Sequence, residues 1–280
     1  MSAINTGHIP EKRKKLKALL KEMSPMIIAF SGGVDSSYLL AMAVDVIGKK
    51  NVIAVTAQAP FFSPFETQHI KGIIQKTGVK HIIFEHHAML QEIFIRNPPD
   101  RCYHCKKMIF SKIRKIADTL QIEHIAHGNN TDDLNDYRPG SKAAQEFNIN
   151  APLISAHLSK ADISNFAKEI GLGNWNQPAM ACLATRIPFN SVITLEKLKM
   201  IHQAELYLFN LGFSGSRVRL SDRTATIEIR QNQLKYFLDG NYQDKLFGHL
   251  KKIGFLDMIV DMKGYRDSTK EKSELELFQV

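Results

Sequence analysis

One short segment, Ser31-Gly32-Gly33-Val34-Asp35-Ser36, combines the residue types that bind a polyphosphate. It follows an apolar run, Met26–Phe30, and precedes an amphipathic stretch, so we expect a strand, a tight loop and a helix in succession. Glycines let the backbone approach an anion, serine hydroxyls add donors, and a helix N-terminus supplies N–H groups and the positive end of its dipole. The segment therefore predicts a pyrophosphate-binding loop. No lysine follows the glycines, which excludes a Walker-type loop, and a glycine turn with Ser and Asp as helix caps is the structural alternative.

Acidic and amide side chains follow a second expected strand. The stretch His127-Gly128-Asn129-Asn130-Thr131-Asp132-Asp133 comes directly after His124–Ala126. The carboxyl ends of parallel strands meet at one edge of a sheet, so this stretch should lie near the glycine loop. Carboxylate oxygens are the ligands that Mg²⁺ prefers beside phosphates, which makes Asp132 a candidate magnesium ligand. A capped turn is the alternative.

The chain contains three cysteines, Cys102, Cys105 and Cys182. An odd number with one C-x-x-C pair argues against a disulfide framework. Three thiolates are too few for a closed zinc site and suit an iron–sulfur cluster with one open iron. A zinc site completed by a histidine and three thiols without metal are the alternatives.

Three arginines complete the candidate chemistry. Cys182 lies in an irregular segment that we expect to be an exposed loop, four residues before Arg186, whose charge would favour the thiolate and could bind a phosphate. Arg217 and Arg219 alternate with apolar residues, so both should lie on one face of a strand and could hold a phosphate. The alternatives are a packed linker for the segment and an exposed polar face for the arginines.

Alternating strands and helices must position these residues in the first part of the chain. The apolar spacing predicts strands at 26–30, 51–56, 81–84, 124–126 and 152–155, and helices near 16–23, 36–48, 64–77, 87–95, 102–120 and 160–170. Ser159 and Asp162 resemble a capping box at the start of the last helix. Such alternation predicts an α/β fold with a parallel sheet.

The pattern changes beyond an irregular stretch at 174–190. A helix is expected at 195–208, a hairpin at 217–229, a helical region at 233–253 and a strand at 255–260, with a frayed tail after Arg266. We therefore expect two domains, 1–190 with the phosphate-binding loop and 191–280 as a smaller α+β unit.

Composition restricts the class of protein. With 280 residues, of which 44% are apolar and 23% charged, the chain has the composition of a soluble globular protein. No apolar run reaches the roughly 18 residues of a membrane span, and no signal sequence is evident, so we expect a cytoplasmic protein without a membrane partner. The net charge of +9 favours anionic partners, either nucleotides, phosphorylated metabolites or RNA.

The phosphate-binding segment resembles the PP-loop of the ATP pyrophosphatases, which cleave ATP between its α and β phosphates and pass AMP to a substrate oxygen. Three further motifs narrow the resemblance: Asn-Asp-Tyr-Arg-Pro-Gly at 135–140, Ala-Cys-Leu-Ala-Thr-Arg-Ile-Pro at 181–188, and Arg217-Val218-Arg219. Together they are similar to the LarE family, the ATP-dependent sulfur transferases of nickel-pincer cofactor synthesis, from about residue 10 to residue 266.

The resemblance implies a PP-loop domain, a smaller C-terminal α+β domain that serves the substrate and oligomer contacts, and a homo-oligomer. It implies that Ser31, Gly32, Gly33, Asp35 and Ser36 bind ATP, with Asp35 and Asp132 placing Mg²⁺. The substrate would be a small nucleotide, a pyridinium biscarboxylate mononucleotide, held by Arg186, Arg217 and Arg219. Glu205 and Glu228 fall on family positions near that site, with Glu205 as a metal ligand, and Tyr236 stands where the family has a second carboxylate.

The family also implies two sulfur sources. One branch takes sulfur from a lone cysteine at the position of Cys182. The additional Cys102 and Cys105 resemble a second branch, in which the three cysteines bind a [4Fe–4S] cluster whose open iron carries a sulfide. We expect the cluster, with a sacrificial Cys182 as the alternative. In either case a substrate carboxylate attacks the α-phosphate, and sulfur then displaces AMP.

Three other functions stay open. A tRNA thiolase also joins a PP-loop to three cysteines, although we recognise no RNA-binding module. An ammonia-dependent synthetase of the NAD or GMP type shares the loop but has no use for the cysteines. A non-enzymatic, zinc-stabilised nucleotide sensor explains the fewest residues.

Overall fold

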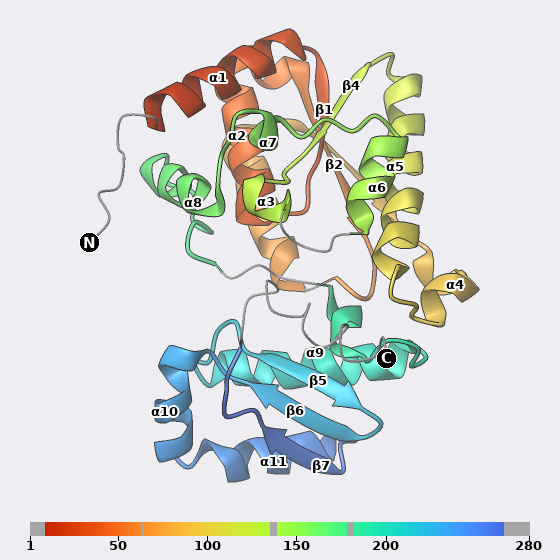
Figure 1. Cartoon of the computed structure of the whole chain (residues 1–280), viewed down its shortest axis with the longest axis vertical. Coiled ribbons are helices and arrows are strands. Elements are labelled where there is room, and N and C mark those ends of the chain that lie inside the picture. Colours follow the sequence, from red (N-terminus) through yellow and green to blue (C-terminus); the bar gives the residue numbers. More distant parts are fainter. Residues whose placement is uncertain (1–8, 63, 135–138, 178–181, 266–280) are drawn as a thin grey trace. The chain divides into compact units, whose positions relative to one another are not determined.

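The computed structural model describes residues 9–62, 64–134, 139–177 and 182–265. These residues form two compact units (Figure 1). The first unit comprises the described residues of 1–59, 64–87 and 102–179, and the second those of 60–63, 88–101 and 180–280. Each unit is therefore assembled from more than one stretch of chain.

The first unit is built on a parallel sheet of four strands in the order β3-β2-β1-β4, which confirms the predicted fold class. The strands are β1 Met26–Ala29, β2 Val52–Gln58, β3 Lys80–Glu85 and β4 His124–His127. In this register Ala29 of β1 pairs with Val55 on one side and with His127 on the other. The chain segments that follow β1 and β4 therefore leave the sheet next to each other.

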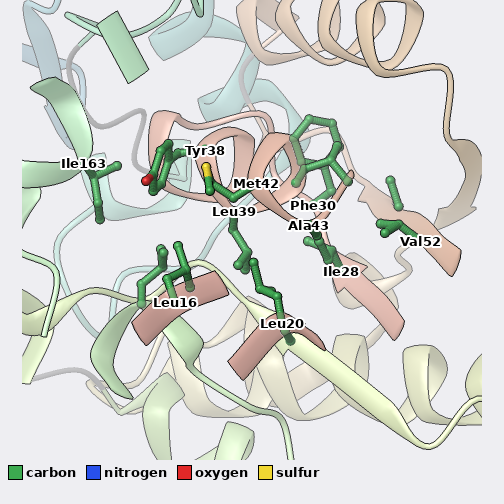
Figure 2. Packing of buried hydrophobic residues seen from close by; sticks show 14 of the residues in the cluster. Leu16, Leu20, Ile28, Phe30, Tyr38, Leu39, Met42, Ala43, Val52 and Ile163 are labelled. Carbon is green, nitrogen blue, oxygen red and sulfur yellow. The ribbon is translucent and has the colours of Figure 1, made fainter. Parts of the chain in front are cut away.

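Helices cover both faces of this sheet. Successive side chains of a strand point to opposite faces, and the apolar side chains on each face are buried by the helices on that side. Ile28 of β1 packs into a core with Leu16, Leu20 and Leu39 (Figure 2), whereas Ile27 belongs to a second core with Phe110 and Ile113. The helices are α1 Ile9–Glu22, α2 Val34–Ile47, α3 Pro64–Thr77, α5 Arg101–Thr119, α6 Gly140–Glu146, α7 Pro152–Ser155 and α8 Lys160–Glu169, with 3₁₀ turns η2 Lys49–Asn51 and η4 Thr131–Leu134.

The strand predicted at 152–155 is wrong, because these residues form the short helix α7. Pro152 occupies the first turn, where its missing N–H is not needed and its fixed φ suits a helix. The pairing with the sheet lies two residues before this helix, where Asn150 forms an isolated parallel bridge with Ala126 of β4. The predicted capping box is present at the start of α8, where Ser159 and Asp162 exchange both hydrogen bonds.

The second unit contains a three-stranded sheet in the order β5-β6-β7, with β5 Arg217–Ser221, β6 Thr224–Glu228 and β7 Asp257–Val260. The antiparallel β5–β6 pair confirms the predicted hairpin, and β7 adds in parallel. The predicted helical region at 233–253 is interrupted at two residues: Gly240 is the C-cap of one helix, and Asn241, with a left-handed φ of 51°, is the N-cap of the next. The helices and turns of this unit are η3 Ala88–Leu90, α4 Glu92–Ile95, η5 Leu183–Arg186, α9 Leu195–Asn210, α10 Gln231–Asp239 and α11 Tyr242–Lys252.

None of the described helices is long and apolar enough to span a membrane.

The histidine that ends β4 makes the stability of the first unit pH-dependent. His127 is 7% exposed and its ring packs edge-on against Phe110. Burial and, to a smaller extent, the charge of Lys106 lower the pKa of His127 to about 3. The unfolded chain therefore binds the proton more tightly than the native state between about pH 6.5 and pH 3.

We predict that the stability contributed by neutral His127 is complete above about pH 6.5 and decreases as the pH falls, by about 2 kcal/mol at about pH 5. Urea unfolding of the wild type and of His127→Asn, each at about pH 7.5 and pH 5, measures this difference. The loss of stability on acidification should be smaller in His127→Asn, whereas His157→Asn, at an exposed histidine, should keep the wild-type value. An unchanged pH dependence in His127→Asn would contradict the prediction.

Candidate active site

The phosphate-binding loop ends at the N-terminus of α2 without a capping side chain. Gly33 precedes the helix in an extended conformation (φ −68°, ψ 160°), and a glycine has no side chain that could cap the first turn. Gly32 has a φ of 83°, in the left-handed region that glycine adopts without strain. The first N–H groups of a helix have no acceptor within the helix. The N-terminus of α2 is thus built to receive an anion.

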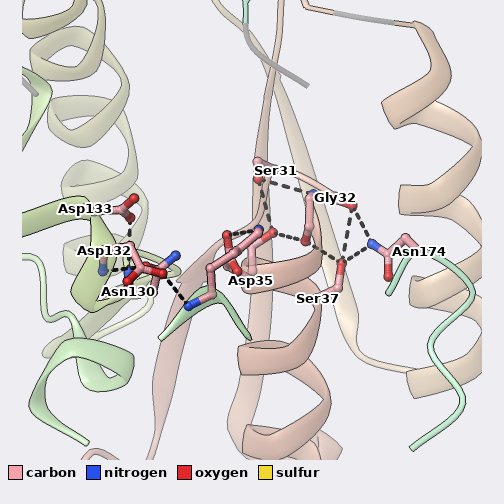
Figure 3. Close-up of polar contacts among 11 residues, drawn as sticks. Ser31, Gly32, Asp35, Ser37, Asn130, Asp132, Asp133 and Asn174 are labelled. Atoms are coloured by element: carbon pink, nitrogen blue, oxygen red, sulfur yellow. Dashed lines mark hydrogen bonds and ion pairs between the residues drawn. The ribbon is translucent and has the colours of Figure 1, made fainter. Parts of the chain in front are cut away.

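Polar side chains fix the carbonyl groups of the loop (Figure 3). The hydroxyls of Ser36 and Ser37 donate to the Gly33 carbonyl at 3.0 and 2.8 Å. The buried Asn174 amide donates to the Gly32 carbonyl at 2.9 Å and to Ser37 Oγ at 3.0 Å. Because these carbonyls already accept hydrogen bonds, the loop conformation is set before any ligand binds.

The two predicted magnesium ligands, Asp35 and Asp132, both contact one lysine. The Lys160 ammonium lies 2.7 Å from the Asp35 carboxylate, and the Lys160 backbone N–H donates to the Asp132 carboxylate, also at 2.7 Å. Lys160 is the first residue of α8. The structure therefore places a cation and two carboxylates beside the phosphate-binding loop, from three different segments.

The acidic stretch after β4 also has a structural role. Asp133 accepts a hydrogen bond from the Asn130 backbone at 3.0 Å, and the Asn130 side chain accepts one from the Asp132 backbone at 2.9 Å. These bonds define a capped turn at η4, as the structural alternative supposed. The Asp132 carboxylate is turned instead to the N-terminus of α8.

Gly128 lets this stretch lie directly against the phosphate-binding loop. A Cβ built on Gly128 would lie 2.7 Å from the Ser36 nitrogen and 2.9 Å from the Ser36 Cα. Carbon atoms do not approach backbone atoms so closely, and backbone atoms cannot move aside as a flexible side chain can. Only glycine fits between the end of β4 and the first turn of α2.

The three predicted arginines lie in the second unit, together with two glutamates. Arg186 Nε donates to Glu205 at 2.6 Å, and Glu205 also accepts from the Val218 N–H at 3.1 Å. Arg219 forms an ion pair with Glu228 across the hairpin. Arg186 and Arg219 meet at one residue, since Arg186 donates to the Thr185 hydroxyl and Arg219 to the Thr185 carbonyl.

Arg217 differs from the other two arginines. Its side chain is 7% exposed, and among the described residues no carboxylate lies within ion-pair distance of it. Burial lowers the pKa of Arg217 to about 10, and the charge of Arg186 contributes, yet the group stays protonated at neutral pH. Among the described residues, three guanidiniums and two carboxylates leave one positive charge without a carboxylate, that of the buried Arg217. An uncompensated buried charge is costly, so this site favours an anionic ligand.

The loop that carries Cys182 and Arg186 is packed, so the expectation of an exposed loop is wrong. Leu183, Ala184 and Arg186 are buried, and Cys182 is half-buried. The Asn97 amide donates to the Ile187 and Pro188 carbonyls, and Arg101 donates to the Ala184 carbonyl at 3.1 Å. Asn97 and Arg101 are themselves buried and hydrogen-bonded to each other. The segment 88–101 thus fixes this loop within the second unit.

Cys102 and Cys105 lie in the first turn of α5, three residues apart and so on one helix face. The buried His86 ring lies beside Cys105, with Nε2 and Sγ 3.2 Å apart. Burial lowers the pKa of His86 to about 4. Cys102 and Cys105 belong to the first unit and Cys182 to the second.

Within the described residues, no group of three or more histidines, cysteines or acidic residues is arranged to hold a metal ion. Glu205 is occupied as the partner of Arg186 and Val218 N. Tyr236 donates or accepts one hydrogen bond with the Tyr242 hydroxyl at 2.7 Å. The motif residues at 135–138, those at 178–181 and the tail from 266 lie outside the described part of the chain.

Comparisons with known proteins agree with this geometry. Residues 12–107, which include the loop and the first three strands, match the NAD synthase family model. An uncharacterized protein of Synechocystis is 34% identical over 92% of this chain and 96% of its own length. The pyridinium-3,5-bisthiocarboxylic acid mononucleotide synthase of Lactiplantibacillus plantarum is 33% identical over 95% of this chain and 98% of its own length.

The chain belongs to the family of this synthase, the LarE family. A third relative, an uncharacterized protein of Methanocaldococcus jannaschii, is 32% identical over 91% of this chain and 98% of its own length. The family resemblance inferred from the motifs is thereby confirmed, while its iron–sulfur type stays a prediction.

Sequence reasoning missed several residues of this LarE-family site. Lys160 follows the capping serine directly, so its place at the start of a helix was visible, but its partner Asp35 is 125 residues away. Asn174 fell in the stretch interpreted as irregular. Asn97 and Arg101 lie between the predicted helices at 87–95 and 102–120, and no role was predicted for them. The steric role of Gly128 had no signal apart from the residue type.

We predict that Gly128→Ala weakens ATP binding about tenfold or more, because the new methyl group separates the end of β4 from the first turn of α2. Isothermal titration with a non-hydrolysable ATP analogue measures the affinity. Gly72→Ala is the control, since its Cβ would meet nothing within 4 Å. Equal affinities in all three proteins would show that the close approach at Gly128 does not matter for the nucleotide.

Proposed function

We propose that this chain is an ATP-dependent, AMP-forming sulfur transferase that converts a carboxylate of pyridinium-3,5-biscarboxylic acid mononucleotide into a thiocarboxylate. The observation that carries the proposal is the relation to the Lactiplantibacillus plantarum synthase, which extends over 95% of the chain and is named for the bisthiocarboxylic acid product. The phosphate-binding loop and the arginines of the second unit would supply the two anion sites that such a reaction requires.

The nucleotide side of the reaction would lie in the first unit. The N-terminus of α2 would bind the β and γ phosphates of ATP through Ser31, Gly32, Gly33 and Ser36. Asp35 and Asp132 fit a magnesium ion by their chemistry, since a cationic group, the Lys160 ammonium, already lies against Asp35. Asp35 and Asp132 would hold the magnesium ion, and the Lys160 ammonium would then be available to a phosphate oxygen.

The substrate side would use the arginines of the second unit. The one buried positive charge of Arg186, Arg217 and Arg219 suits the phosphate of the mononucleotide, and a planar guanidinium binds phosphate through two parallel hydrogen bonds. Glu205 and Glu228 hold two of the three arginines in place. We also propose that Glu205 binds a metal. One carboxylate oxygen of Glu205 would then have to bind the metal in place of its hydrogen bond with Arg186.

The chemistry would run in two displacements. A carboxylate oxygen of the substrate attacks the α-phosphorus of ATP, the bond to the bridging oxygen breaks, and pyrophosphate leaves with the electron pair. A sulfide then attacks the acyl carbon of the mixed anhydride, and AMP leaves. The Lys160 ammonium, which lies 2.7 Å from the Asp35 carboxylate, would stabilise the pyrophosphate as it departs.

For the sulfur source we propose a [4Fe–4S] cluster bound by Cys102, Cys105 and Cys182. Cysteine thiolates are the usual ligands of such a cluster, and Cys102 and Cys105 lie on one face of α5 beside His86. When bound, such a cluster would supply a sulfide on an iron that no cysteine occupies. Sacrifice of Cys182 is the alternative source. A homo-oligomer, as the family implies, is also proposed here.

We predict that the wild type releases pyrophosphate from ATP and Mg²⁺ only when the mononucleotide is present. Asp35→Asn should lower kcat/KM about 100-fold, and Lys160→Met about 10- to 100-fold, because each removes a charged contact to the triphosphate or its metal. Lys17→Met, which breaks an exposed pair with Asp45, is the control and should stay within about twofold. Pyrophosphate release with ammonia or tRNA in place of the mononucleotide would favour the alternative functions.

We predict that anaerobic reconstitution of the wild type with iron and sulfide loads about four of each per chain, and that Cys102→Ala loads much less. Iron and acid-labile sulfide are measured directly, with the charge-transfer absorbance as a second readout. His104→Ala, at a residue between the two cysteines, should keep the full load. Zinc without iron, lost in His104→Ala, would show a zinc site instead.

A further inference from the structure

We propose that Tyr265 is a positioning residue of the phosphate site: it holds the Arg217 guanidinium in place and leaves its positive charge for the ligand. This proposal rests on the proposed function, because it concerns the binding of the mononucleotide phosphate by Arg217. It adds a residue that no motif of the sequence indicated.

The Arg217 guanidinium lies against the face of the Tyr265 ring. The Arg217 Cζ lies 3.9 Å from the centroid of the Tyr265 ring. One NH₂ group of Arg217 also donates to the Tyr265 hydroxyl. A guanidinium has five N–H donors in its plane, so stacking and one hydrogen bond fix its orientation and leave other donors at its edge.

Backbone contacts with the end of β6 place Tyr265 beside Arg217. The Tyr265 N–H donates to the Ile229 carbonyl at 2.7 Å, and Tyr265 forms a parallel bridge with Arg230. The preceding Gly264 has a φ of 65°, and a Cβ there would lie 2.7 Å from the Ile229 oxygen. Only glycine allows this turn to lie against the end of β6. The turn is therefore tied to the strand that pairs with Arg217 in β5.

The charges of the neighbouring side chains explain why a tyrosine is suited to contact Arg217. Arg186 and Arg219 are each held by a glutamate, which cancels their charge. A glutamate beside Arg217 would cancel the remaining charge as well, and the site would then lose its attraction for a phosphate. A stacked aromatic ring stabilises a buried cation through its quadrupole and carries no charge of its own. Tyr265 thus compensates the burial of Arg217 without competing with an anion.

The test compares Tyr265→Phe, which keeps the stack, with Tyr265→Leu, which removes the stack and the hydrogen bond. Isothermal titration with pyridinium-3,5-biscarboxylic acid mononucleotide should show a Kd raised about threefold in Tyr265→Phe and about tenfold or more in Tyr265→Leu. In steady-state assays KM should rise by these factors while kcat changes less. The control is Tyr207→Leu, which removes a stack on His249 in the same unit.

A second readout follows Arg217 itself. Phenylglyoxal modifies accessible arginines, and mass spectrometry locates the adduct. The Arg217 adduct should form several times faster in Tyr265→Leu than in Tyr207→Leu, and the mononucleotide should protect it.

The outcomes separate the two proposals. If the wild type does not bind the mononucleotide, the proposed function fails and the role of Tyr265 in it fails too. If the wild type binds it and both Tyr265 variants bind equally well, or if Tyr207→Leu weakens binding as much as Tyr265→Leu, only the role of Tyr265 is overturned.

Discussion

The bare N-terminus of α2 is the constraint on which the nucleotide side of this protein depends. The helix begins after two glycines, so its first N–H groups have no capping side chain. The loop carbonyls are held by Ser36, Ser37 and Asn174, and Gly128 allows the end of β4 to lie against the first turn. These contacts come from three separate parts of the chain. Together they fix a site for a polyphosphate before it binds, which lowers the entropy cost of binding.

A second constraint of the same kind governs the arginines. Arg186 and Arg217 are buried and Arg219 is partly exposed, and this arrangement is tolerated because Arg186 and Arg219 have carboxylates and Arg217 has an aromatic ring. The charge that remains is what an anionic substrate can use. Among the described residues, both sites thus leave a specific electrostatic requirement unsatisfied, and we propose that a phosphate group meets each of them.

Much of the fold followed from the sequence, because apolar periodicity is a local property. The parallel sheet, the hairpin and the capping box of α8 were all predicted and are present. The strand predicted at 152–155 is absent, since a proline followed by the apolar or small residues Leu153, Ile154 and Ser155 suits a short helix as well as a strand. The exposed loop around Cys182 was also wrong, because the buried partners that pack it, Asn97 and Arg101, lie more than 80 residues earlier in the chain.

The sequence by itself determined the residue types of the chemistry: a glycine loop between a strand and a helix, a C-x-x-C pair, and two arginines at a spacing of two. These signals are local, and motif spacing within one strand or one helix turn preserves them. Only the tertiary structure decided which charges meet. It brought Lys160 to Asp35, gave Arg186 and Arg219 their glutamates, and left Arg217 with Tyr265. The reason is physical, since the partner of a buried charge is set by how distant segments pack and not by the neighbours of a residue in the chain.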